Sequence, residues 1–277
     1  MNLSLSVRIA EGFLSKEESI MDLGPLCELA KAAGFQSLCM RASQVGIHSS
    51  PDTIAKAAET IREHGLTVSM VTGDFDIVYN NEKGPDCLTN ISPYLDLAQA
   101  LGAPMIRVAI KKEEDIEATR KAADEAAKCG IRIVHQCHTL SLFETVEGIL
   151  DTLRIIDRPN VGLIYEPANL EGCEQAYGFE TLTRLKPWIF NVYLQNQQLK
   201  PGGSITLDTW CRGSFSFDLI QIHEAGGIDF PGVFSGLRAI GYSGPVTVHQ
   251  SAPDGGSPEE SATATAAYLK KLIASSG

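Results

Sequence analysis

Several polar residues of this chain stand at the ends of short apolar segments, at positions that would bring them together in a folded sheet. Gln136, Glu166, Gln195 and His249 each end such a segment, and His138 follows Gln136 by two residues. One carboxylate, one or two imidazoles and amide oxygens suit Mn²⁺, Co²⁺, Mg²⁺ or Zn²⁺. We therefore predict Gln136, Glu166, Gln195 and His249 as ligands of a divalent metal. Because two of these four residues are amides, a metal-free hydrogen-bonding pocket is the alternative.

The alternation of side chains along an extended segment decides which residues share a face. The inner faces then carry Gln136 with His138, Glu166 with Ile164, Gln195 with Tyr193, and His249 with Thr247. The same rule points Phe190, Val192 and Leu194 outward. His135 and Cys137 also point outward, so we expect His135 to be structural and Cys137 not to act as a nucleophile.

Two residues could remove a proton from a substrate, namely Glu166 and His138. For Glu166 the alternative role is an ion pair with an arginine such as Arg107. Arg8 and Arg41 also stand at strand ends, and all three arginines either bind substrate or pair with carboxylates inside the fold. The other candidates for substrate binding are Asn169, Asn196 and Trp210.

A recurring unit positions these residues: a helical segment ends in glycine, and a short β-rich segment follows. The unit occurs at residues 31–40, 62–71, 99–108, 127–136 and 238–250. Glycine at this place predicts a left-handed helix cap. Further strands are expected at 3–9, 160–166 and 188–196, which makes eight. Helical patterns lie at 17–33, 52–64, 86–101, 113–128, 142–155, 178–186, 230–240 and 259–274.

Strands that alternate with helices pair in parallel, and eight such units in 277 residues predict a single (β/α)8 TIM barrel over residues 1–277. An open doubly wound sheet is the competing fold. It favours a glycine-rich phosphate turn after the first strand, but the sequence there, RIAEGFLSKEE, has no GxGxxG motif. The one long irregular segment is 196–228. It follows a strand and is therefore expected on the catalytic face, where Trp210, Phe215 and Phe217 suggest that it packs as a lid.

The composition limits the classes of partner. The formal charge is −11 and the pI about 5.0, with no basic stripe, which disfavours nucleic-acid binding. No apolar segment reaches the roughly 18 residues of a membrane span, and residues 1–10 lack the pattern of a signal peptide. The seven cysteines include no CxxC pair, which predicts reduced thiols and argues against a structural zinc site. We expect a cytoplasmic protein whose partner is a small molecule.

Four segments resemble the sugar phosphate isomerase/epimerase family of xylose isomerase-like barrels: GIRIVHQCH, RPNVGLIYEPANL, NVYLQN and GYSGPVTVHQ. The resemblance covers nearly the whole chain. It implies a divalent metal held by Glu, Asp, His and Glu on strands five to eight. Those positions hold, in order, Gln136, Glu166, Tyr193 and His249. On the seventh strand Gln195 is the better donor, and a second family histidine near the substrate matches His138. The ligand set is therefore divergent.

The resemblance implies an enzyme that isomerises or epimerises a sugar, keto-sugar or related polyol through an enediolate. Glu166 or His138 would take the proton next to the carbonyl, and the metal with an arginine would stabilise the enediolate oxygen. A lyase that eliminates a β-substituent from an oxidised glycoside shares this intermediate and is the first alternative. A non-catalytic sugar-binding barrel is the second, and the charge disfavours a metal-dependent nuclease. By analogy with relatives, a homo-oligomer is possible.

Overall fold

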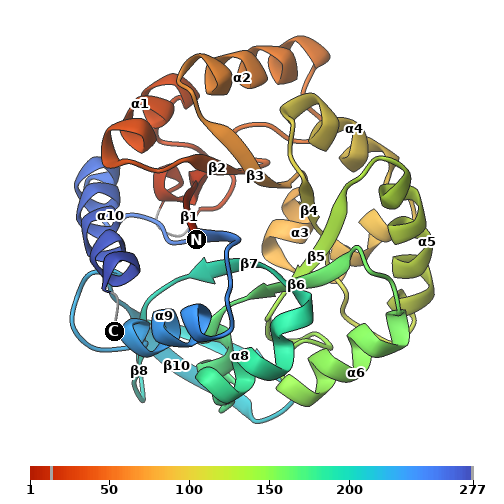
Figure 1. Cartoon of the computed structure of the whole chain (residues 1–277), viewed down its shortest axis with the longest axis vertical. Helices are drawn as coiled ribbons and strands as arrows, with labels where there is room; N and C mark the ends of the chain where they lie inside the picture. Colours follow the sequence, from red (N-terminus) through yellow and green to blue (C-terminus); the bar gives the residue numbers. More distant parts are fainter. Residues whose placement is uncertain (13–14, 276–277) are drawn as a thin grey trace.

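The computed structural model describes residues 1–12 and 15–275. Eight parallel strands close into a barrel in the order β1-β11-β7-β6-β5-β4-β3-β2, with helices around it (Figure 1). The predicted (β/α)8 barrel is confirmed. The barrel strands are β1 (Asn2–Ser6), β2 (Ser37–Arg41), β3 (Thr67–Thr72), β4 (Met105–Arg107), β5 (Arg132–Gln136), β6 (Val161–Tyr165), β7 (Ile189–Leu194) and β11 (Pro245–Val248).

The helices between the strands carry the caps that the sequence predicts. All five glycines of the recurring unit have a positive φ, which confirms the left-handed caps: Gly34, Gly65, Gly102, Gly130 and Gly241. The helices are α1 (Leu23–Ala33), α2 (Pro51–Glu63), α3 (Phe75–Tyr79), α4 (Ser92–Leu101), α5 (Asp115–Lys128), α6 (Val146–Ile156), α7 (Pro167–Gly172), α8 (Phe179–Leu185), α9 (Phe230–Ala239) and α10 (Pro258–Ala274). Within the described ranges, no helix combines the length and the apolar character needed to span a membrane.

Two predicted helices are shorter than expected. The helix predicted from residue 17 begins only at Leu23, because the preceding segment turns back and pairs Ser19 with Glu11. The helix predicted over 86–101 divides into a 3-10 turn, η2 (Gly84–Leu88), and α4. Pro93 lies in the first turn of α4, where its missing N–H breaks no helical hydrogen bond.

The first strand is also shorter than predicted, and this places Arg8. β1 ends at Ser6, and residues Val7–Ala10 form a 3-10 turn, η1, instead of continuing to residue 9. The cause is local: the Ser6 Oγ accepts a hydrogen bond from the Arg8 backbone N–H at 3.3 Å and caps the turn. Arg8 therefore lies beyond the last strand residue, at the carboxyl end of β1.

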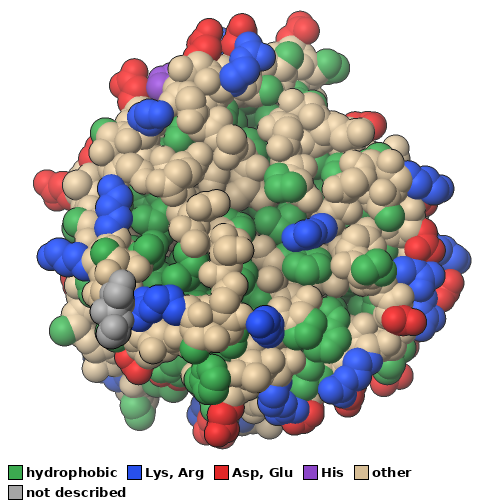
Figure 2. Space-filling view, viewed as in Figure 1, with side chains coloured by type: hydrophobic (Ala, Val, Ile, Leu, Met, Phe, Trp, Pro, Cys, Tyr) green, Lys and Arg blue, Asp and Glu red, His purple; other side chains and the backbone are tan. Residues whose placement is uncertain are grey.

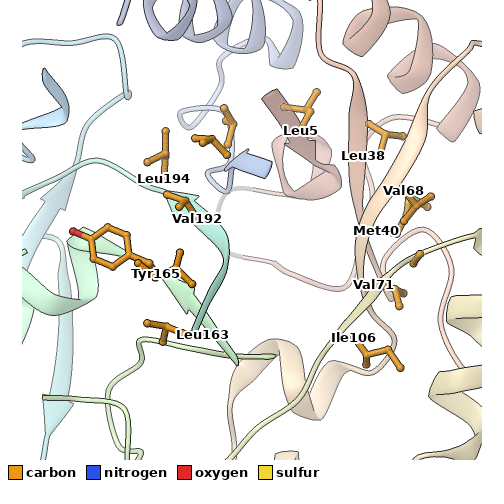
Figure 3. Packing of buried hydrophobic residues seen from close by; sticks show 14 of the residues in the cluster. Leu5, Leu38, Met40, Val68, Val71, Ile106, Leu163, Tyr165, Val192 and Leu194 are labelled. Carbon is orange, nitrogen blue, oxygen red and sulfur yellow. The ribbon is translucent and has the colours of Figure 1, made fainter. Parts of the chain in front are cut away.

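Buried hydrophobic residues form two layers. The larger layer lies between strands and helices, and Figure 3 shows side chains such as Leu38, Val71, Leu163 and Val192 on this side of the strands. A second cluster fills the inside of the barrel with Cys39, Met70, Met105, Val134, Ile164 and Tyr193. The inner positions of Val134, Ile164 and Tyr193 confirm the predicted alternation on β5, β6 and β7.

Phe190 is an exception to that alternation. It was expected to face outward with Val192 and Leu194, but it packs against the inner cluster instead. The register explains this, because Leu163 pairs with Ile189 whereas Ile164 pairs with Asn191. Phe190 is thus the extra residue of a β-bulge, which turns its side chain into the amino end of the barrel.

Residues 196–228 are more regular than predicted. They contain a small antiparallel sheet in the order β8-β10-β9, formed by β8 (Gln197–Leu199), β9 (Ile205–Thr209) and β10 (Gly213–Leu219). Phe215 and Phe217 are buried, and the Phe215 ring leaves no room for a Cβ at Gly172 of α7. The sheet thus packs against α7, and in the view of Figure 1 it lies to one side of the barrel centre.

Candidate active site

Glu166 stands at the carboxyl end of β6, immediately before α7, with 1% of its surface exposed. Its Oε2 accepts hydrogen bonds from the Asn169 Nδ2 at 2.7 Å and from the Gln136 Nε2. Burial raises the pKa of Glu166 to about 7, although these hydrogen bonds and the charges of Arg8 and Arg107 act in the opposite direction. The carboxyl group can therefore hold or release a proton near neutral pH.

Asn169, which is predicted to bind substrate, makes a positioning contact with Glu166. Its Nδ2 donates to the backbone carbonyl of Cys137 at 2.7 Å as well as to Glu166. It lies in the first turn of α7, three residues after Glu166, so the turn itself brings the two side chains together. Asn169 fixes the Glu166 carboxylate against β5.

Arg41, at the end of β2, forms a buried ion pair with Glu11. The Nε and Nη2 atoms of Arg41 donate to the two carboxylate oxygens of Glu11 at 2.8 and 3.1 Å. The Ser43 hydroxyl adds a third hydrogen bond to Glu11 at 2.6 Å. Arg41 and Glu11 are 1% and 2% exposed, so this pair is shielded from water. Of the two roles predicted for Arg41, the contact with a carboxylate is the one formed.

His249 follows β11 and lies in the barrel mouth, as its alternation predicts. Its ring stacks on Tyr193 with 3.9 Å between ring centroids, and its Nδ1 lies 3.2 Å from the Ser6 Oγ. The Nη1 of Arg41 lies 3.5 Å from the Nε2. Burial and the charge of Arg8, followed by those of Arg41 and Arg107, lower the pKa of His249 well below its usual value. The imidazole is neutral and sits among cations.

Arg8 and Arg107 also reach the mouth. Arg8 donates from Nη1 to the Gln195 Oε1 at 3.1 Å and to the His249 carbonyl at 3.3 Å. Arg107 is 2% exposed, and its buried Nε has no hydrogen-bond partner within the described ranges. An ion pair with Arg107 is the alternative role that the sequence allows for Glu166. This ion pair is not formed among the described residues. Burial lowers the pKa of both arginines, that of Arg8 to about 10.

Sequence reasoning missed Lys16. It lies between η1 and α1, just before the helix that the sequence predicts from residue 17, and its Nζ is 5.3 Å from the centroid of the Tyr79 ring. Burial, together with the charges of Arg8, Arg41 and Arg107, lowers the pKa of Lys16 to about 7. The signal that could have found it is topological, since every segment that follows a barrel strand lies on the catalytic face.

His138 lies beyond Gln136, at the rim of the mouth, and is partly exposed. Its Nδ1 is 3.0 Å from the Thr139 carbonyl and 3.0 Å from the Asn80 Nδ2. Burial and the charge of Arg107 lower its pKa well below the usual value. His138 is therefore a neutral hydrogen-bonding group, with Nε2 left for other contacts.

Two other predicted substrate contacts lie elsewhere. The Asn196 side chain binds the segment before α9: it donates to the Gln221 carbonyl at 3.1 Å and accepts from the Ile228 N–H at 3.0 Å. Trp210 is 53% exposed in the turn between β9 and β10. That turn is tied to the barrel by Glu144, whose carboxylate accepts the backbone N–H of Trp210 at 2.9 Å. The sequence pattern could not show these local uses. The two outward residues, His135 and Cys137, are buried as expected.

The four predicted metal ligands offer a divalent metal too few free donor atoms, because only the Gln136 Oε1 and one carboxylate oxygen of Glu166 lack a hydrogen-bond partner among the described residues. The Gln195 Oε1 accepts from Arg8, the His249 Nε2 faces Arg41, and the Glu166 Oε2 already accepts two hydrogen bonds. Among the described residues, no cluster of three or more His, Cys, Asp or Glu side chains is arranged to hold a metal ion. Nearby positive charges also repel a further cation. The residues present do not fit the predicted metal, and guanidinium groups occupy its surroundings.

Comparisons with known proteins agree with this fold. A family model described as xylose isomerase-like TIM barrel matches residues 27–272. No curated protein matches the chain significantly.

Solved structures of several proteins share the fold at low sequence identity. A probable 3-DHS dehydratase from Bacillus anthracis is 15% identical, with a TM-score of 0.69 over 98% of this chain and 99% of that one. An IolI protein with bound zinc is 17% identical, with a TM-score of 0.73 over 99% and 98%. A D-allulose 3-epimerase from Methylomonas sp., solved with D-allulose, is 16% identical, with a TM-score of 0.68 over 98% and 97%.

Proposed function

The chain belongs to the family of xylose isomerase-like TIM barrels, and from that premise we propose that it is an enzyme that isomerises or epimerises a small sugar, keto-sugar or related polyol. The reaction removes a proton from a carbon next to a carbonyl group and passes through an enolate. The observation that carries the proposal is the burial of Glu166 in the barrel mouth with a pKa of about 7. A general base is most effective when its pKa lies near the working pH.

Glu166 is held in one orientation for this role. The hydrogen bonds from Gln136 and Asn169 both fall on Oε2, so Oε1 is the oxygen that takes the substrate proton. A carboxylate that is fixed before the substrate arrives has no orientational freedom to lose during the reaction. The same oxygen can return the proton to the substrate, because a pKa near 7 keeps the protonated form populated.

The enolate oxygen needs positive charge, and this chain supplies it from arginine. The charges of Arg8 and Arg107 act directly on Glu166, which sets them close to the reacting carbon. N–H donors in a buried site stabilise developing negative charge more strongly than they do in water. The proposal routes no step through a metal, because Arg8 and Arg41 lie beside the Gln195 and His249 donor atoms and leave a divalent ion too few ligands.

His138 serves substrate binding in this proposal, not proton transfer. Its lowered pKa makes the imidazole a weak base and leaves little imidazolium at neutral pH. The Nδ1 either donates to the Thr139 carbonyl or accepts from the Asn80 Nδ2, and in both cases the Nε2 is left for a substrate hydroxyl.

Proton exchange tests the proposal directly. The protein is incubated in D₂O with keto- and aldo-sugars, their acids and their phosphates, and loss of the C–H signal next to the carbonyl is followed by NMR. Glu166→Gln is expected to lower the exchange rate by about 10²–10⁴-fold. Glu171→Gln, on the same helix and half-buried, is the matched control and should stay within about twofold of wild type.

The same spectra separate the alternatives. Elimination of a β-substituent gives an unsaturated product and would assign the chain to a lyase with the same base. Exchange that EDTA abolishes and Mn²⁺ restores would contradict the metal-free reaction. If compounds of the panel bind but none of them exchanges its proton, the enzyme proposal is wrong and the chain is a sugar-binding barrel.

A further inference from the structure

The cations of the barrel mouth differ in how far they are neutralised. Arg41 is held by both carboxylate oxygens of Glu11, and Arg8 gives Nη1 to neutral acceptors. Arg107 forms no ion pair within residues 1–12 and 15–275, and its Nε is buried without a hydrogen-bond partner there. Lys16 adds a fourth positive group from the segment above.

A buried guanidinium without a partner is costly. Removing a charged donor from water costs several kcal/mol unless an acceptor replaces the lost hydration. Arg107 lies two residues beyond Met105, which belongs to the inner cluster, and opposite Val134 of the same cluster. Its side chain therefore points into the barrel, where packing alone gives no reason to keep an arginine. The unfilled donor indicates that an acceptor comes from outside residues 1–12 and 15–275.

The local charge indicates which kind of acceptor. The charges of Arg41 and Arg107 lower the pKa of Arg8, and the charges of all three arginines lower the pKa of Lys16. The carboxylates that act on these groups and on Arg107 are Glu11 and Glu166. The mouth is therefore cationic, although the whole chain carries a formal charge of −11. A buried field of this sign attracts anionic oxygen atoms. The planar donor edge of a guanidinium also matches a carboxylate or a phosphate through two parallel hydrogen bonds.

We propose that Arg107, with Arg8 and Lys16, forms a subsite for an anionic oxygen group of the substrate, either a carboxylate or a phosphate. Arg41 does not take part directly, because Glu11 occupies its donors, but it orders the wall beside His249. This inference rests on the proposed function only in assigning the anion to a substrate. The subsite itself is a property of the free protein and is measured without turnover.

Calorimetric titration of the purified chain tests the subsite with two probes, inorganic phosphate and glycolate. Arg107→Gln is expected to lower the affinity for the preferred probe by about 10–100-fold, the range for one charge-assisted contact. Lys16→Gln should weaken it several-fold, and because its side chain is only half-buried this variant keeps the test open if Arg107→Gln folds poorly. The matched control is Arg132→Gln, on the neighbouring strand but at its exposed amino end.

The outcomes are distinct. Binding of phosphate but not glycolate assigns a phosphate group, and the reverse assigns a carboxylate. Glu166→Gln should abolish proton exchange yet bind the anion as tightly as wild type or more tightly, since it removes a negative charge from the mouth. The subsite is wrong if neither probe binds, or if Arg132→Gln loses binding while Arg107→Gln and Lys16→Gln retain it. If the chain binds the anion but exchanges no proton with any compound of the panel, this inference stands and the proposed function is wrong.

Discussion

The two ends of the barrel use the same eight strands in opposite ways. The carboxyl end buries charged and polar side chains, among them Arg41, Glu166 and His249. The amino end has a hollow of about 640 Å³, whose lining mixes apolar side chains such as Phe190 and Tyr242 with serine, threonine and asparagine side chains. Figures 1 and 2 look onto this amino end, where hydrophobic side chains are visible at the centre. The charged side chains of its lining are Arg132 and Lys186, and no carboxylate or histidine joins them.

This difference separates function from packing. Buried charges lower stability unless each is paired, so a fold without a use for them fills the same space with hydrophobic residues. At the amino end the bulged Phe190 packs against the inner hydrophobic cluster and lines the hollow. The carboxyl end keeps one arginine without a partner among the described residues and one carboxyl group with a raised pKa. We therefore expect the residues of the mouth to serve activity at a cost in stability. We expect the residues of the amino end to contribute to stability and not to activity.

The largest stability effect is expected at the Arg41–Glu11 pair. Glu11→Gln removes the charge that neutralises a buried guanidinium and should lower the free energy of unfolding by about 3–5 kcal/mol. Urea denaturation of the two proteins measures this difference. The control is Glu147→Gln, which breaks the exposed pair with Arg184 and should cost below about 1 kcal/mol. Equal losses in both variants would contradict a special role for the buried pair.

Glu166→Gln should stabilise the protein at alkaline pH. The folded pKa of Glu166, about 7, lies above its ordinary value of 4.5, so the folded state binds the proton more tightly. Its favourable contribution is complete below pH 4.5 and is lost as the pH rises to about 7. The variant does not titrate and should exceed wild type by about 2–3 kcal/mol at pH 8, with a smaller difference at pH 5. A difference independent of pH would contradict the raised pKa.

Most of the barrel could be predicted from the sequence because its signals are local. The glycine caps and the alternation on β5 and β6 depend on a few neighbouring residues, and both are confirmed. The errors occur where one residue changes the register. The bulge at Phe190 and the early end of β1 at Ser6 depend on pairing and capping that composition does not reveal. The sheet in 196–228 was missed because the abundant glycines of that segment masked the alternation around Phe215 and Phe217.

The site was predictable in its members but not in their pairing. Alternation placed Glu166, Gln136 and His249 in the mouth, since strand parity fixes which face they share. It could not show that Arg41 would face the His249 Nε2, because that contact joins residues 208 positions apart. Three of the donor atoms expected to bind a metal, on Gln195, His249 and Glu166, instead face arginine or amide N–H groups, whereas the Gln136 Oε1 has no partner among the described residues. Such competition between partners is decided by three-dimensional packing.

The smallest effect is expected at the amino end, where Gly162 of β6 lies under Phe190. A Cβ at residue 162 would lie 2.3 Å from the Phe190 ring and 2.7 Å from the Trp188 carbonyl. Gly162→Ala should therefore cost about 1–3 kcal/mol by overpacking. Gly24→Ala is the control, since a Cβ there meets nothing within 4 Å. Adding Phe190→Leu should recover part of the loss, and proton exchange should be unchanged throughout. An exchange rate that falls in the folded Gly162→Ala variant would show that the two ends are coupled, and would break the division between them.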